Sequence, residues 1–140
     1  MKKLTRREHE RARQFTERYG ERGGAAGLAI EREVIGENVG LNGYTTPAQV
    51  DRLARELRLR RGTALLDLGA GRGWPGVRLA KQTGSAVVLA DVPRPALKSA
   101  LGRARRERIA GRCSVVQMTA NALPFAPDSF DAIVHTDVMC

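Results

Sequence analysis

The chain has 140 residues, of which 42% are hydrophobic, 28% charged and 4% aromatic, and its net charge is +9. This composition is typical of one ordinary globular domain, and it excludes a collagen, a coiled coil, a disulfide scaffold and a disordered tail. No window approaches the run of about 20 apolar residues that a membrane span requires, and the charged N-terminus lacks an apolar signal core. We therefore expect a cytoplasmic protein without a membrane span.

Basic residues are concentrated in two parts of the chain. Those before Arg22 alternate with glutamates, as on a solvated helix face. The denser cluster opposes only Glu107 and consists of Arg94, Lys98, Arg103, Arg105, Arg106, Arg108 and Arg112. Phosphate neutralisation by such residues dominates non-specific nucleic-acid affinity, but aromatic residues that could stack on bases are nearly absent. We interpret the cluster as an exposed helix face and do not expect a nucleic-acid partner, with a basic RNA-binding module as an alternative.

Cysteine and histidine do not form a metal-ligand pattern. Cys113 and Cys140 lack metal-ligand spacing, and His9 and His135 do not cluster with them. The sequence predicts free thiols and no metal site.

Residues 1–60 are predicted to form an N-terminal helical segment or lid. Its best-defined helix starts where Thr46 can cap, Pro47 suits the first helical position and Gln49 can complete a capping box. The apolar stripe of this helix is Val50, Leu53, Ala54 and Leu57. The glycine-rich stretches 20–27 and 36–46 are predicted to be hinges or binding loops.

Residues 61–140 alternate short apolar runs with helical segments. The predicted strands are 63–68, 86–90, 113–118 and 131–135, and the predicted helices are 74–83 and 95–110. Apolar strands that alternate with helices imply right-handed crossovers and a parallel sheet that is covered on both faces. The predicted fold class is α/β, and such sheets bind ligands at the carboxyl ends of their strands, where the strand order reverses.

The clearest motif is the glycine loop Gly69–Gly73, which directly follows the first predicted strand. Glycine at every second position lets the chain turn tightly and present bare N–H groups to a ligand. Residues 71–76 also fit the dinucleotide fingerprint G-x-G-x-x-G. In that fingerprint the first glycine follows the strand directly, and a count from Gly69 places Trp74 where the third glycine should be. We interpret Arg72 and Trp74 as loop surface and helix-start packing.

Two acids lie at the ends of the first two predicted strands. Burial of Asp67 in an apolar strand is costly unless its carboxylate meets a cation or hydrogen-bond donors, so it contacts either a ligand or loop amides. Asp91 ends the second strand, where a carboxylate can accept both hydroxyls of a ribose. NAD-binding proteins use the same arrangement, so an NAD-type oxidoreductase fragment stays an alternative.

The segment between the third and fourth predicted strands contains Leu123-Pro124-Phe125 and Ser129-Phe130-Asp131. With the glycine loop and Asp91, it makes residues from about 45 to 140 resemble the class I S-adenosylmethionine-dependent methyltransferases. The resemblance implies a Rossmann-like sheet of about four parallel strands, S-adenosylmethionine as cofactor with S-adenosylhomocysteine as product, and methyl transfer to a small-molecule acceptor. The motifs are most similar to those of quinone C-methyltransferases and small-amine N-methyltransferases, without separating the two.

The resemblance also implies a set of cofactor-binding residues. Asp67 and the glycine loop would hold the methionyl part, Asp91 the ribose hydroxyls, and Val92 would pack on the adenine. Thr119 stands where the family usually has an Asp that reaches the adenine amino group. The full set is Tyr44, Asp67, Gly69, Ala70, Gly71, Gly73, Asp91, Val92, Thr119 and Ala120.

The end of the fourth predicted strand provides the candidate catalytic residues, His135 and Asp137. Either could orient an acceptor or act as its base. Alternatively, His135 completes the strand and Asp137 caps the next helix.

Sheets of the family normally have more strands, so we expect a chain truncated after the fourth strand. The free edge of 131–135 then predicts a homodimer or higher self-association.

Overall fold

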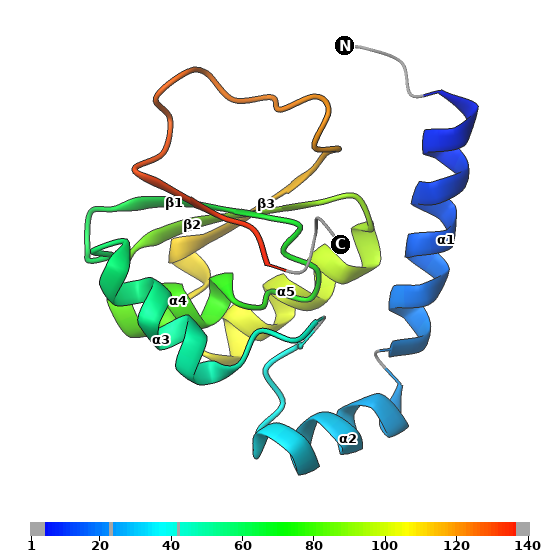
Figure 1. Cartoon of the computed structure of the whole chain (residues 1–140), viewed down its shortest axis with the longest axis horizontal. Helices are drawn as coiled ribbons and strands as arrows, with labels where there is room; N and C mark the ends of the chain where they lie inside the picture. Colours follow the sequence, from blue (N-terminus) through cyan, green and yellow to red (C-terminus); the bar gives the residue numbers. More distant parts are fainter. Residues whose placement is uncertain (1–4, 23, 42, 137–140) are drawn as a thin grey trace.

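A parallel sheet forms the centre of the protein in the computed structural model, which describes residues 5–22, 24–41 and 43–136 (Figure 1). Its strands are β1 (Ala64–Leu68), β2 (Ala86–Asp91), β3 (Cys113–Gln117) and β4 (Ala132–Val134). They lie in the order β3-β2-β1-β4, and every neighbouring pair is parallel. The chain moves outward from β1 through β2 to β3 and returns to the far side of β1, so the switch point lies at the carboxyl ends of β1 and β4. The predicted α/β fold class is confirmed.

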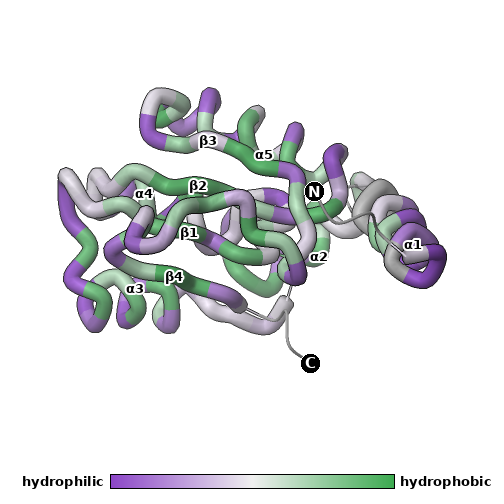
Figure 2. Tube along the Cα trace, turned by 90° about the horizontal axis from the view of Figure 1, so that it is seen from above, coloured by the Kyte–Doolittle hydropathy of each residue, from purple (hydrophilic) through white to green (hydrophobic). Residues whose placement is uncertain are grey.

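The helices are α1 (Arg6–Arg22), α2 (Ala25–Ile35), α3 (Pro47–Glu56), α4 (Gly76–Thr83), α5 (Arg94–Arg106) and the 3-10 helix η1 (Ala110–Arg112). Helices α3, α4 and α5 lie on one face of the sheet (Figure 1). There the buried Leu65 and Leu89 of the sheet pack with Val50, Leu79 and Leu97 from these helices. Figure 2 shows that hydrophobic residues follow the strands, whereas α1 is largely hydrophilic.

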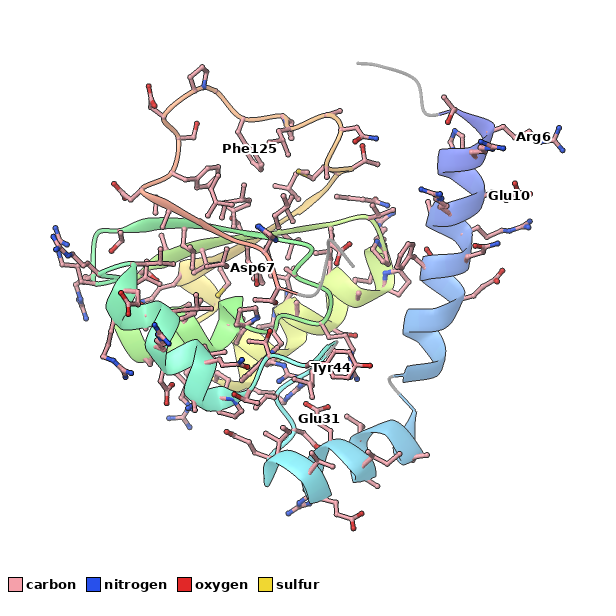
Figure 3. The ribbon with its side chains drawn as sticks, viewed as in Figure 1. Arg6, Glu10, Glu31, Tyr44, Asp67 and Phe125 are labelled. Atoms are coloured by element: carbon pink, nitrogen blue, oxygen red, sulfur yellow. The ribbon has the colours of Figure 1, made fainter. Side chains whose placement is uncertain are left out.

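The opposite face of the sheet has a smaller apolar core. Leu66 and Met118 are buried there, with Phe125 and Phe130 packed against them. The two rings meet edge to face, with centroids 4.9 Å apart, and Phe125 comes from the loop that arches over this face (Figure 3). Among the described residues, a loop instead of a helix connects β3 to β4. This loop forms the cover that the sequence predicts for the second face of the sheet.

The N-terminal helix α1 lies beside the rest of the molecule and contacts α2 and α5 (Figure 1). Arg6 and Glu10 project from it away from the sheet (Figure 3). No helix among the described residues is long and apolar enough to cross a membrane.

The start of α3 agrees with the prediction from the sequence. The Thr46 Oγ1 accepts a hydrogen bond from the Gln49 N–H at 3.3 Å, and the Gln49 Oε1 accepts one from the Thr46 N–H at 2.7 Å. This is the capping box that the sequence predicts.

Three other predicted boundaries are wrong. The stretch 20–27 is largely helical, because α1 runs to Arg22 and α2 begins at Ala25; packing of a helix tolerates an isolated glycine. Helix α4 begins at Gly76 instead of 74. Helix α5 ends at Arg106 instead of 110, since Arg108 adopts a left-handed backbone conformation with φ +57° that ends the helical run.

The described part of the chain contains one cysteine, Cys113, which is a buried free thiol in β3. Burial raises its pKa to about 11. Cys140 lies outside the described residues.

Candidate functional site

The glycine loop leaves β1 at the carboxyl edge of the sheet in a conformation that favours glycine. Gly69, Gly71 and Gly73 have φ values of +81°, +51° and +96°, a region that costs other residues energy because their Cβ crowds the backbone. Gly73 has a second constraint, since a Cβ there would lie 2.7 Å from the Val77 side chain. The loop therefore presents bare backbone at this edge.

Hydrogen bonds fold the loop back over the end of β2. The N–H groups of Gly69 and Ala70 donate to the Ala90 carbonyl oxygen at 2.8 and 3.1 Å. The Gly71 N–H donates to the Asp91 Oδ2 at 2.6 Å. The loop and Asp91 thus form one site although they come from different strands.

Asp67 lies beneath this loop and is fully buried. Its Oδ2 accepts a hydrogen bond from the Gly76 N–H at 2.8 Å, while its buried Oδ1 has no hydrogen-bond partner among the described residues. Burial raises the pKa of Asp67 to about 8; the Gly76 N–H acts in the opposite direction, and the nearby Asp91 carboxylate raises it further. The carboxyl group is therefore mostly protonated at pH 7.

Asp91 ends β2 in a partly buried position. Its Oδ1 accepts from the Val92 N–H at 2.7 Å and its Oδ2 from the Gly71 N–H. Burial raises the pKa of Asp91, and these two N–H groups partly offset that effect. Each carboxylate oxygen retains a further lone pair, so the group can also accept from hydroxyl donors.

The other predicted cofactor residues follow β3 at the same edge of the sheet. The Met118 N–H donates to the Asp91 carbonyl oxygen at 2.9 Å, which places Thr119 beside the end of β2. Thr119 then opens a turn in which its carbonyl oxygen accepts from the Ala122 N–H at 3.1 Å. Thr119 is partly buried and Ala120 is exposed.

The predicted catalytic residues occupy the end of β4. His135 is exposed and directly follows this strand, at the carboxyl edge. Asp137 lies outside the described residues.

Tyr44 lies outside the contacts between the loop and Asp91. Its side chain is 91% exposed. It lines a cavity of about 320 Å³ to which Ile30, Glu31 and Val34 of α2, the chain around Leu41, and Arg72 also contribute. The cavity is thus lined both by α2 and by Arg72 of the glycine loop.

The interpretation of Arg72 as loop surface is wrong, whereas Trp74 packs in the core beside the start of α4 as predicted. Arg72 is buried, and its Nη2 lies 3.6 Å from the Glu31 Oε2. The Trp74 indole is also buried and donates to the Thr45 carbonyl oxygen at 2.9 Å. Both side chains thus point from the loop toward the N-terminal segment.

Glu31 is the residue of this region that the sequence analysis missed. It is buried on α2 and shares the helical spacing of Leu28 and Ile35, which are partly buried. An acid within such an apolar stripe is the signal that could have identified it.

Arg103 also departs from the predicted exposed basic face. Its Nη1 donates to the Asn38 carbonyl oxygen at 3.0 Å. Burial lowers the pKa of its guanidinium to about 10, an effect that Glu31 partly offsets. Arg94, Lys98, Arg105, Arg106 and Arg108 are exposed as expected.

Comparisons with known proteins agree with this geometry. A family model described as a methyltransferase domain matches residues 65–140. Methyltransferase GfsG of Streptomyces halstedii is 34% identical over 113 residues, which are 73% of this chain and 41% of that protein. The ubiquinone/menaquinone biosynthesis C-methyltransferase UbiE of Klebsiella pneumoniae is 38% identical over 77 residues, which are 54% of this chain and 31% of that protein. The S-adenosylmethionine-dependent methyltransferase of Geobacter sulfurreducens, solved in complex with S-adenosyl-L-homocysteine, superimposes with a TM-score of 0.59 and 26% identity over 66% of this chain and 37% of that chain.

The sheet order, the glycine loop and the two acids define the Rossmann-like fold of the class I S-adenosylmethionine-dependent methyltransferases. The chain belongs to the methyltransferase-domain family, whose model covers more than half of it. The family resemblance expected from the sequence is confirmed. The chain spans less than half the length of the two curated relatives described above.

Proposed function

We propose that this chain binds S-adenosylmethionine at the carboxyl edge of its sheet and serves in methyl transfer to a small-molecule acceptor. The observation that supports this most directly is the 2.6 Å hydrogen bond between the Gly71 N–H and Asp91, which joins the glycine loop to the acid of the neighbouring strand. The residues present fit the cofactor, because the site combines a glycine backbone without side chains with the buried Asp67 Oδ1, which has no hydrogen-bond partner among the described residues.

Each part of the site would hold a different part of the cofactor. Asp67 and Gly69–Gly73 would hold the methionyl part, and Asp91 would accept the ribose hydroxyls. Val92, Thr119 and the Ala120 N–H would contact the adenine. When bound, the cofactor supplies an electrophilic methyl group on a sulfonium, so the work of the chain is to bind and orient.

For the acceptor, we propose a small molecule with an apolar part. The cavity beside the glycine loop has apolar walls from Ile30, Val34 and Leu41, with Tyr44 at its edge. Similarity to a C-methyltransferase of ubiquinone and menaquinone biosynthesis supports such an acceptor. His135 and Asp137 would orient the acceptor or remove its proton.

The division of the chain is also part of the proposal. Residues 1–60 would form a helical segment or lid, and residues 61–140 the cofactor-binding half-domain. Contacts of Arg72 and Trp74 with the N-terminal segment support the lid, since they connect it to the glycine loop. A cytoplasmic location belongs to the same proposal.

Calorimetric titration of the folded chain tests the cofactor. We expect S-adenosylhomocysteine to bind and NADH not to bind, because a count from Gly69, which directly follows β1, places Trp74 where the third glycine of the dinucleotide fingerprint should be. Binding of NADH with enhanced fluorescence, and none of S-adenosylhomocysteine, would favour the NAD-type oxidoreductase. Steeply salt-dependent binding of RNA without S-adenosylhomocysteine binding would favour the basic RNA-binding module instead.

We further propose that the chain self-associates through the β4 edge. β4 pairs with β1 alone among the described strands, and its central residue, Ile133, is 54% exposed. Since an unpaired apolar edge is a template for another strand, Ile133→Lys is expected to shift the wild-type dimer to monomer in light scattering. Phe15→Lys, which removes an exposed aromatic ring from α1, should leave the mass unchanged. A wild-type monomer at high concentration would refute the proposal.

A further inference from the structure

The ion pair between Glu31 and Arg72 is the most deeply buried one among the described residues. Its side chains are 4% and 9% exposed, whereas every other described ion pair contains a side chain that is at least 42% exposed. Exposed pairs contribute little to stability. A buried pair is costly to desolvate, and removal of one partner leaves an uncompensated charge. This pair therefore constrains the two elements that it joins, α2 and the glycine loop.

Both members of the pair also hold the connector between α2 and α3. The Glu31 Oε1 accepts hydrogen bonds from the N–H groups of Gly40 and Leu41 at 2.5 and 2.9 Å. The Arg72 Nη2 donates to the Leu41 carbonyl oxygen at 3.1 Å. Leu41 is thus held at its N–H by one member of the pair and at its carbonyl by the other.

Gly40 lets the connector approach this closely. Its φ of +78° favours glycine, and a Cβ at this position would collide with the Arg103 guanidinium and lie 2.9 Å from the Arg72 carbonyl oxygen. A side chain here would separate the connector from the glycine loop. Glycine at position 40 is therefore what permits the close approach of the connector to the glycine loop.

A continuous path of contacts leads from the connector to the cofactor site. Arg72 directly follows Gly71, whose N–H donates to Asp91. Glu31 and Tyr44 lie close together in Figure 3, and both line the cavity described above with Arg72 of the glycine loop. A rearrangement of the loop at Gly71 would reach Leu41 through Arg72.

We propose that Glu31 is a positioning residue that couples the connector to the cofactor-binding loop through Arg72. This rests on the proposed function. When a ligand occupies the site at Gly71 and Asp91, the guanidinium of Arg72 is fixed, and Glu31 then holds Gly40 and Leu41 against the loop. By reciprocity, the same contacts strengthen ligand binding.

The first test compares Glu31→Gln with Glu37→Gln by calorimetric titration with S-adenosylhomocysteine. Glu37 is a matched control, since it also pairs with an arginine, Arg78, but is 57% exposed. Glu31→Gln is expected to weaken binding by about fivefold or more, the lower end of typical couplings between sites, and Glu37→Gln should leave it unchanged. In an Arg72→Gln background, the further loss of affinity caused by Glu31→Gln should be smaller than in the wild type, because both residues act through the same contact.

The second test measures hydrogen exchange, first in the wild-type chain and then in Glu31→Gln. S-Adenosylhomocysteine should slow hydrogen exchange at the amides of Gly40 and Leu41, and Glu31→Gln should abolish that effect. If the wild type binds the ligand but these amides exchange unchanged, or if folded Glu31→Gln binds with wild-type affinity, the coupling is wrong and the proposed function stands. If the folded wild type does not bind the ligand, both are wrong. If Glu31→Gln does not fold, hydrogen exchange at Gly40 and Leu41 of the wild type decides whether the coupling exists.

Discussion

Asp91→Ala is expected to weaken the binding of S-adenosylhomocysteine by about ten- to a hundredfold, which corresponds to the loss of charge-assisted hydrogen bonds. The substitution removes the proposed acceptor for the ribose hydroxyls. It also frees the N–H groups of Gly71 and Val92, which donate to this carboxylate. Asp91→Asn keeps one acceptor oxygen and should fall between the wild type and Asp91→Ala in calorimetry.

Asp131→Asn is the matched control for Asp91. The Asp131 Oδ2 accepts from the Ala64 N–H at 2.8 Å, but at the amino end of β1, on the edge opposite the proposed cofactor site. The affinity of Asp131→Asn for S-adenosylhomocysteine should equal that of the wild type. Equal affinity of Asp91→Ala and wild type, with both folded by circular dichroism, would contradict the assignment of the cofactor to this site.

Asp67→Asn is expected to change how the free energy of unfolding depends on pH. In the folded chain the pKa of Asp67 is raised from 3.8 to about 8, so between these values the native state retains a proton that the unfolded state has lost. The stability from this proton is fully present below about pH 4 and is lost as the pH rises toward 8. The slope is about 1.4 kcal/mol per pH unit.

The asparagine variant carries no such proton, so its stability relative to the wild type should rise between pH 5 and 7. Urea unfolding at several pH values measures this difference. Any cost of the buried amide shifts all values equally and leaves the slope intact. Asp131→Asn, at an exposed carboxylate, should run parallel to the wild type. Parallel curves for Asp67→Asn would show that the Asp67 carboxyl is ionised in the folded chain.

The agreement between sequence and structure is best where the physical cause is local. The capping box at Thr46 depends on residues within one turn, and the conformation of Gly71 follows from its missing Cβ. The positions of Asp67 and Asp91 follow because Asp67 is the penultimate residue and Asp91 the last residue of an apolar run that forms a buried strand. These features specify the edge of the sheet where the cofactor site is proposed.

The sequence by itself thus determined the parallel α/β class, the glycine loop and the two strand-end acids, because apolar runs and glycine spacing act over a few residues. Only the tertiary structure decided that Arg72 and Trp74 turn inward, and that Arg103 leaves the basic face for Asn38. It alone also showed that Glu31 meets Arg72 across 41 positions of the chain. The burial and partner of a charge depend on which distant segments pack against it, and no local pattern around Arg72 carries that information.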